Sequence, residues 1–240
     1  MTSLERIDRY LRAEMEKLRS VTPDLREPAA PRPFITISRQ AGAGGHALAA
    51  AMLEVFAHQE DVELFGGWQI FDHNLCEIIA ADPAYSGSLD SLLAEEYRTP
   101  TTDFFHQLVR STADQDRVMS RVFQLVRSIA AIGNAIIIGR AGSQVTKGMQ
   151  PGIRLRVVAP EGVRIKRMME IATLDERQAR NQARKMDAHR ASLLRAYFET
   201  DIADPTNYDV TWNSASSSLI EIAEATTALL RRRLAETPPV

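Results

Sequence analysis

Short apolar runs alternate with helical patterns along most of this chain. Five runs are rich in apolar and β-branched residues and therefore predict strands. They lie at residues 34–39, 68–72, 135–140, 153–158 and 208–213. Between them, apolar residues recur at the three- and four-residue spacing of helices. These helical segments lie at residues 45–56, 75–81, 103–132, 160–171 and 219–234. The alternation predicts one α/β domain built around a parallel sheet.

Two of the predicted strands differ in their surroundings. Residues 135–138 are all apolar, which is typical of a strand buried on both faces of a parallel sheet. Within residues 153–158, Arg154 and Arg156 alternate with apolar residues. This alternation predicts that the strand at residues 153–158 lies nearer the edge of the sheet.

A glycine-rich turn joins the first strand to the first helix. Glycines let the backbone turn sharply and direct its N–H groups into one concavity, and the helix N-terminus adds partial positive charge. Such a turn suits a phosphate group, and an ordinary tight βα turn is the alternative. The candidate nucleotide-binding residues of this stretch are Ser38, Arg39, Gly42, Ala43, Gly44, Gly45, His46 and Ala47.

The turn departs from the phosphate-loop pattern G-x-x-x-x-G-K-[ST]. If Gly44 takes the second glycine position, Arg39 takes the first and Gly45 takes the position of the lysine. The hydroxyl position then falls on His46, or on Ala47 if one further glycine follows the lysine position. The loop is therefore predicted to keep its backbone cradle without the lysine and the hydroxyl that usually contact phosphate and magnesium.

Two charged residues follow predicted strands at the same edge of the sheet as the loop. Asp72 ends the second strand and Arg140 follows the third, and ligands of parallel sheets gather at the carboxyl ends of strands. Asp72 is expected either to contact a ligand or to cap the next helix, and the two roles can coexist. Arg140 is expected to bind an anion through its forked donors, with a structural salt bridge as the alternative.

Residues 175–190 are the most charged part of the chain. Helical spacing places Arg177, Arg180 and Arg184 on one face, with Arg190 beyond them. Such a run is usually a solvated surface. It is also compatible with a mobile lid, at about residues 172–200, that closes cations over a polyphosphate.

Composition narrows the possible partners and compartments. With 240 residues and a net charge of -2, the chain suits one folded unit without a broad surface for nucleic acid. Its single cysteine excludes an internal disulfide framework and provides no zinc-ligand spacing. We expect no metal-ligand cluster. We also expect no contact with a membrane and a cytoplasmic location, because no signal peptide or membrane span stands out.

The two ends of the chain differ from the domain between them. Residues 1–20 have the pattern of an amphipathic helix. A proline-rich linker follows, and this N-terminal part of the chain ends at residue 33. The apolar stripe of this helix is expected to pack on the body or on a second copy in a homodimer, with a disordered arm as the alternative. The domain is predicted to cover residues 34–234, and residues 235–240 form a tail.

The order of these features resembles the cytidylate kinase-like family of the P-loop nucleoside monophosphate kinase fold. The resemblance covers roughly residues 34–230 and rests on five stretches. They are residues 35–45 with their Ser-Arg pair and variant loop, Phe71-Asp72, residues 136–140 ending in Gly-Arg, residues 187–190 followed by Tyr197, and residues 204–209. The resemblance implies a P-loop NTPase-type parallel sheet with helices on both faces, a helical substrate-binding region and an arginine-bearing lid.

The resemblance also implies transfer of the terminal phosphoryl group of ATP, with magnesium, to a nucleoside monophosphate or a similar small acceptor. In our hypothesis Arg39 supplies part of the absent lysine's charge and Arg140 holds an anionic group of the acceptor. Arg180, Arg184 and Arg190 close over the donor phosphates, and Asp72 orients an acceptor hydroxyl or a metal-bound water. Magnesium is then held largely by phosphates and water.

Two other functions fit the same residues. One is a non-catalytic nucleotide sensor or assembly module that has kept the cradle and lost the chemistry. The other is a kinase of a non-nucleotide small molecule. We favour a kinase because a changed loop accompanied by so many arginines indicates reworked chemistry, since phosphoryl transfer needs mainly positioning and positive charge.

Overall fold

A computed structural model describes residues 32–72 and 112–236 of the chain. Five strands form its sheet: β1 (Phe34–Arg39), β2 (Gln69–Phe71), β3 (Ala135–Ile138), β4 (Gly152–Val158) and β5 (Val210–Asn213). The longer helices are α2 (Gly45–Ala57), α6 (Thr112–Ile132), α8 (Glu161–Ala172), α9 (Glu176–Phe198) and α10 (Leu219–Glu236). Short turns of helix, α3 (Val62–Phe65), α7 (Gly142–Val145) and the 3₁₀ segment η2 (Pro205–Asn207), were not predicted.

All strand pairs of the described sheet are parallel, in the order β2-β3-β1-β4-β5. The glycine loop therefore starts from the central strand, β1, between β3 and β4. The prediction that residues 153–158 lie nearer the sheet edge than residues 135–138 is wrong, because β4 pairs with both β1 and β5 and lies one place from an edge, as β3 does. Its arginines have partly buried partners within the protein: Arg154 pairs with Asp209, and Arg156 donates to Ser38 Oγ.

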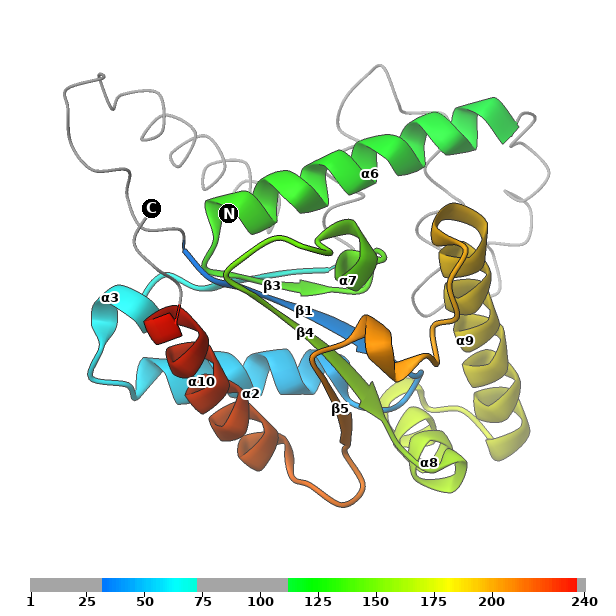
Figure 1. Cartoon of the computed structure of the whole chain (residues 1–240). Helices are drawn as coiled ribbons and strands as arrows, with labels where there is room; N and C mark the ends of the chain where they lie inside the picture. Colours follow the sequence, from blue (N-terminus) through cyan, green and yellow to red (C-terminus); the bar gives the residue numbers. More distant parts are fainter. Residues whose placement is uncertain (1–31, 73–111, 237–240) are drawn as a thin grey trace, which may run out of the picture.

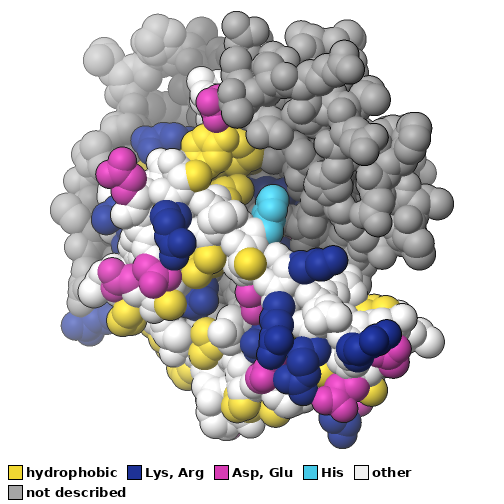
Figure 2. Space-filling view, turned by 90° about the vertical axis from the view of Figure 1, so that its right-hand side faces the viewer, with side chains coloured by type: hydrophobic (Ala, Val, Ile, Leu, Met, Phe, Trp, Pro, Cys, Tyr) yellow, Lys and Arg dark blue, Asp and Glu magenta, His cyan; other side chains and the backbone are white. Residues whose placement is uncertain are grey.

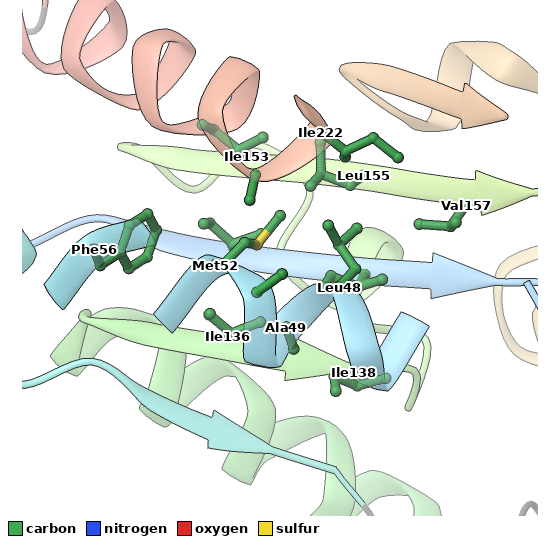
Figure 3. Close-up of a cluster of buried hydrophobic side chains, with 14 of the residues drawn as sticks. Leu48, Ala49, Met52, Phe56, Ile136, Ile138, Ile153, Leu155, Val157 and Ile222 are labelled. Carbon is green, nitrogen blue, oxygen red and sulfur yellow. The ribbon is translucent and has the colours of Figure 1, made fainter. Parts of the chain in front are cut away.

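Helices cover both faces of the sheet, as predicted (Figure 1). On one face, α2 and α10 pack on β1, β3 and β4, and Figure 3 shows the side chains of this layer meeting between helix and sheet. Helix α2 buries Leu48, Met52 and Phe56 there because their spacing places them on one side of the helix. On the other face, α6 and α7 pack through Val122, Val126 and others against Phe34 and Ile137.

Helices α8 and α9 stand at the carboxyl ends of the strands (Figure 1). They share a small apolar cluster that includes Ile165, Met168 and Ala183 and reaches Ala41 of the glycine loop. At the far end of α9, Tyr197 donates to Asp116 of α6 at 2.9 Å. Residues 176–198 thus form one continuous helix that packs on the domain at both ends, and whether it moves as a lid stays a prediction.

Several predictions fall outside the described residues. These are the N-terminal helix and linker, the helix at residues 75–81, the first part of the helical segment at 103–132, and most of the tail. None of the described helices is long and apolar enough to cross a membrane.

Candidate active site

The glycine loop closes tightly between β1 and α2. Gly42 has a φ of +73°, and a Cβ added to it would overlap the backbone carbonyl of Arg164 on α8. Gly44 has a φ of +91° and forms the N-terminal cap of α2. Only glycine adopts these conformations without strain, and at Gly42 only glycine fits. The close packing of Gly42 on α8 and the cap at Gly44 therefore fix the tight turn of the loop between β1 and α2.

Arg39 lies at the position where the phosphate-loop pattern has its first glycine, and its side chain runs along the loop. A Cβ added to Gly45 would lie 3.0 Å from Arg39 Cγ, and one added to Gly139 would overlap Arg39 Nη1. The stem of Arg39 thus starts against Gly45, where the lysine is missing, and its guanidinium lies over Gly139. Since Arg39 is only 6% exposed, two glycines make room for one buried cation beside the loop.

A cavity of about 380 Å³ lies over the loop. Its wall combines polar, cationic and apolar side chains. Besides residues of the loop, the lining includes Arg39, Arg167 and Arg190 together with Ile171, Met186 and Leu219. Ile171 is 68% exposed at this wall, and a large apolar side chain in that position suits contact with a ligand. The cavity is large enough for a small-molecule ligand, and its lining offers such a ligand both cationic and apolar contacts.

A second, much smaller cavity of about 20 Å³ adjoins the end of β3. Arg39, Arg140 and Arg190 line it, and each of these side chains is at most 6% exposed. Arg39 and Arg190 also line the large cavity. Among the described residues no Asp or Glu lines either cavity, so both favour an anion.

The turn that carries Arg140 is bent in an unusual way. Gly139, Arg140 and Ala141 all have left-handed backbone conformations, with φ values of +76°, +51° and +53°. Left-handed conformations cost free energy in residues other than glycine, and they concentrate at functional sites. As predicted, the Gly-Arg pair follows directly after β3, and the turn places Arg140 at the small cavity rather than at the large one.

Asp72 follows directly after β2 and points to the first turn of α2. Its Oδ2 lies 3.4 Å from Nε2 of His46, whose side chain is 48% exposed in the wall of the large cavity. The predicted meeting of Asp72 with the glycine loop is therefore present. The described residues contain no group of three His, Cys, Asp or Glu side chains that could hold a metal ion. A cation here would need its other ligands from phosphates and water.

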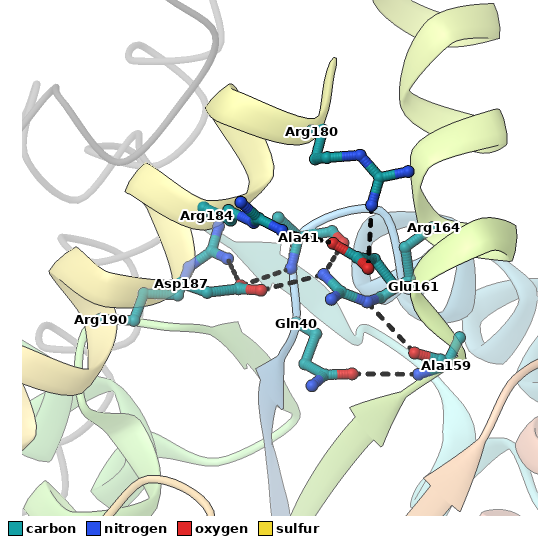
Figure 4. A network of polar contacts seen from close by, with 9 residues as sticks. All are labelled: Gln40, Ala41, Ala159, Glu161, Arg164, Arg180, Arg184, Asp187 and Arg190. Carbon is teal, nitrogen blue, oxygen red and sulfur yellow. Dashed lines mark hydrogen bonds and ion pairs between the residues drawn. The ribbon is translucent and has the colours of Figure 1, made fainter. Parts of the chain in front are cut away.

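The structure separates the arginines of α9 into two sets (Figure 4). Arg180 pairs with Glu161 and Glu176 at 2.9 Å and 2.8 Å, and Arg184 lies 3.6 Å from Glu161. The hydrogen bond and charge of Glu176, and then those of Glu161, raise the pKa of Arg180. Neither arginine lines the cavities, whereas Arg190 lines both. Figure 2 faces the side of the molecule that carries α8 and α9, and it shows that many Lys and Arg side chains there have acidic neighbours.

Sequence reasoning missed several side chains of the site. Arg167 lines the large cavity and donates to Ser214 through Nη1 and Nη2, both at 2.8 Å. Arg156, 6% exposed, lies beneath the loop with Ser38 and Tyr208. The alternation within residues 153–158 singles out Arg156, but no signal in the sequence distinguishes Arg167 from its charged neighbours.

A protein-family model matches residues 34–216, under the description "Cytidylate kinase-like family". The chain belongs to the cytidylate kinase-like family. The match spans the glycine loop, the Gly-Arg turn, α9 and β5, so the predicted resemblance and the P-loop NTPase-type α/β fold are both confirmed. Family membership supports a kinase-type phosphotransferase in general terms.

The chain is also similar to solved structures, of which the first agrees with this fold. An uncharacterized protein from Eubacterium ventriosum aligns with a TM-score of 0.62 at 18% identity, over 84% of this chain and 100% of its own. Shikimate kinase from Acinetobacter baumannii, in complex with shikimate, aligns with a TM-score of 0.45 at 13% identity, over 85% and 94% of the two chains. No curated protein matches the sequence.

Proposed function

We propose that this protein is an ATP-dependent phosphotransferase that transfers the terminal phosphoryl group to a nucleoside monophosphate or a similar small acceptor. One observation carries the proposal: two buried arginines, Arg39 and Arg190, lie between a nucleotide-sized cavity over the glycine loop and a small arginine-lined cavity beside it. A phosphoryl group that passes from one cavity to the other remains next to both guanidinium groups.

The donor phosphates would lie over the loop at the N-terminus of α2, with the base toward Ile171, Met186 and Leu219. An anionic group of the acceptor would bind at Arg140. During transfer an acceptor oxygen forms a bond to the terminal phosphorus, and the bond from that phosphorus to the bridging oxygen of ADP breaks. The negative charge that spreads over the transferring group is what Arg39 and Arg190 would stabilise.

The residues fit a nucleotide polyphosphate with its magnesium ion. Magnesium keeps most of its water and often takes only one or two protein carboxylates, so a full set of protein ligands is not needed. Asp72, whose carboxylate lies beside His46 at the end of the loop, would orient a metal-bound water or an acceptor hydroxyl. Bound magnesium would neutralise charge on the phosphates during transfer.

Calorimetric titration with ADP and ATP, followed by an assay of ADP release over a panel of nucleoside monophosphates and other small acceptors, tests the proposal. We expect nucleotide binding in the presence of magnesium and turnover with at least one anionic acceptor. Binding without turnover over the whole panel would favour the sensor, and turnover only with a sugar or an antibiotic would favour a non-nucleotide kinase. Absence of nucleotide binding would refute all three.

A further inference from the structure

Asp187 on α9 lies at the junction between the glycine loop and the two helices that face it (Figure 4). Its Oδ1 accepts a hydrogen bond from the backbone N–H of Ala41 at 2.7 Å. Its Oδ2 lies 2.9 Å from Nη1 of Arg164, and its Oδ1 lies 3.3 Å from Nη1 of Arg190. One carboxylate thus contacts the loop, α8 and the arginine that lines both cavities.

Arg164 and Ala159 also hold the glycine loop in place. Nη1 of Arg164 also donates to the backbone carbonyl of Ala41 at 2.9 Å, so both polar backbone groups of Ala41 have partners outside the loop. Nε of Arg164 donates to Ala159 O, and the side chain of Gln40 accepts from Ala159 N. Residues 40–42 are therefore held between β4, α8 and α9 in the conformation that the structure records.

Arg190 depends on Asp187 for its position. Within the described part of the chain, Asp187 is the one hydrogen-bond partner of Arg190, and the buried Nε of Arg190 has none. A buried guanidinium donor without a partner is costly unless a ligand supplies an acceptor. Because Arg190 lines both cavities, the Asp187 carboxylate aims it at the place where a ligand anion would lie.

We propose that Asp187 is a positioning residue, which couples the conformation of the glycine loop to the placement of Arg190 between the two cavities. This inference rests on the proposed function, because it assigns Asp187 to the binding of the donor phosphates. Asp187 acts through the Ala41 amide and the Arg190 guanidinium and touches no phosphate itself. It takes over part of the organising task that a loop lysine performs elsewhere.

A purely electrostatic role predicts the opposite result. Asp187 carries a negative charge near an anion site, so if it served only as a counter-charge, its neutralisation would strengthen phosphate binding. If it serves as a positioning residue, neutralisation releases Arg190 and the loop, and phosphate binding weakens. The sign of the change therefore separates the two roles.

The experiment compares the full-length wild type with D187N and with D61N as a matched control. Asp61 also accepts a backbone N–H, from Leu64 at 2.9 Å, and it is exposed at the start of α3. The ligands are ADP and inorganic pyrophosphate, each titrated calorimetrically. We expect D187N to weaken both by the same factor of about ten, because the affected contacts lie at the phosphates, whereas D61N leaves both dissociation constants unchanged.

A double-mutant cycle then tests the connection with Arg190. In an R190A background, D187N should weaken pyrophosphate binding by a smaller factor than in the wild type, because the Arg190 guanidinium, one of the two groups that Asp187 places, is already gone. If D187N does not fold, as judged by its melting curve, D187E keeps the charge but moves the carboxylate by one methylene. Weaker binding by D187E then supports the positioning role, and unchanged binding contradicts it.

Unchanged or tighter binding by D187N, or additive effects of the two substitutions, would overturn the positioning role. A wild type that binds neither ADP nor pyrophosphate would instead refute the proposed function. The two failures are therefore distinguishable.

Discussion

Arginines at the carboxyl edge of the sheet fall into two regions that differ in burial and partners. Arg39, Arg140 and Arg190 are at most 6% exposed and line cavities without acidic side chains among the described residues. Arg180 and Arg184 lie on the outer side of α9 and pair with Glu161. Exposed ion pairs contribute little to stability, whereas burying a charged side chain is costly unless nearby charges and hydrogen bonds compensate it, as Asp187 does in part for Arg190. Burial and the cavities that the side chains line, rather than charge density in the sequence, therefore mark the candidate anion site.

The largest effect should come from the cation beside the loop. We expect R39A to lower turnover by about 10²–10³-fold, since removal of one donor to a transition state has effects of that size. The measurement is kcat/KM for ATP with the best acceptor of the panel. R39K keeps the positive charge but lacks the forked guanidinium group that lies over Gly139. It should therefore recover only part of the turnover that R39A loses. Wild-type turnover by R39A would remove Arg39 from the mechanism.

The partly buried arginines that pair with Asp209 should contribute to stability. Burial opposes ionisation of Asp209, but hydrogen bonds from Arg154 and Arg233 outweigh it and lower the pKa of Asp209 below its ordinary value of 3.8. D209N should therefore lower the free energy of unfolding by about 1–3 kcal/mol at pH 7. Urea denaturation measures this loss.

The pH dependence of the same variant gives a second check. A group whose pKa is lower in the folded state stabilises the fold at pH values above its unfolded pKa. That contribution is lost as the pH falls through the folded pKa. The stability difference between wild type and D209N should consequently be largest near neutral pH and shrink below about pH 4. A difference that does not change with pH would contradict the assigned cause.

The position of Arg39 can be tested with a matched pair of glycine substitutions. G139A introduces a methyl group into the space of the Arg39 guanidinium, and G148A introduces one at a similar φ, +81°, with no atom within 4 Å. Both variants should lose about 1–2 kcal/mol of stability from backbone strain. Only G139A should also weaken ADP binding, by about tenfold, as measured by calorimetry. Equal binding by the two variants would show that displacement of Arg39 has no effect on the nucleotide.

The smallest effects should come from the outer arginines of α9. We expect R180A and R184A to change the dissociation constant of ADP by less than about threefold, because their partners are exposed glutamates. A large loss for either variant would mean that α9 moves and brings these side chains to the phosphates, as the lid hypothesis requires. Melting curves of both variants provide the control for folding.

Much of the fold follows from local pattern. The apolar runs, the glycine turn and the helical spacings predict all five strands and the long described helices, because strands buried in a parallel sheet and helices that cover it leave direct periodic signals. The position of β4 does not follow from its pattern. Arg154 and Arg156 imitate the alternation of an edge strand, and only their partners, Asp209 and Ser38, reveal that β4 is internal.

The candidate site, like the fold, could be predicted from the sequence only in part. The sequence by itself determined that a glycine loop, without the lysine and hydroxyl of the phosphate-loop pattern, follows the first strand of a kinase-like sheet, since strand ends and glycines are local features. The strand order, which places that strand at the centre, came from the structure. Only the tertiary structure decided which cations reach it. Arg180 and Arg190 belong to one charged helix, and their separation depends on what packs against each: Glu161 for the first, and Asp187 with the two cavities for the second. Contacts between distant segments are a property of packing, and the periodicity of one helix does not contain them.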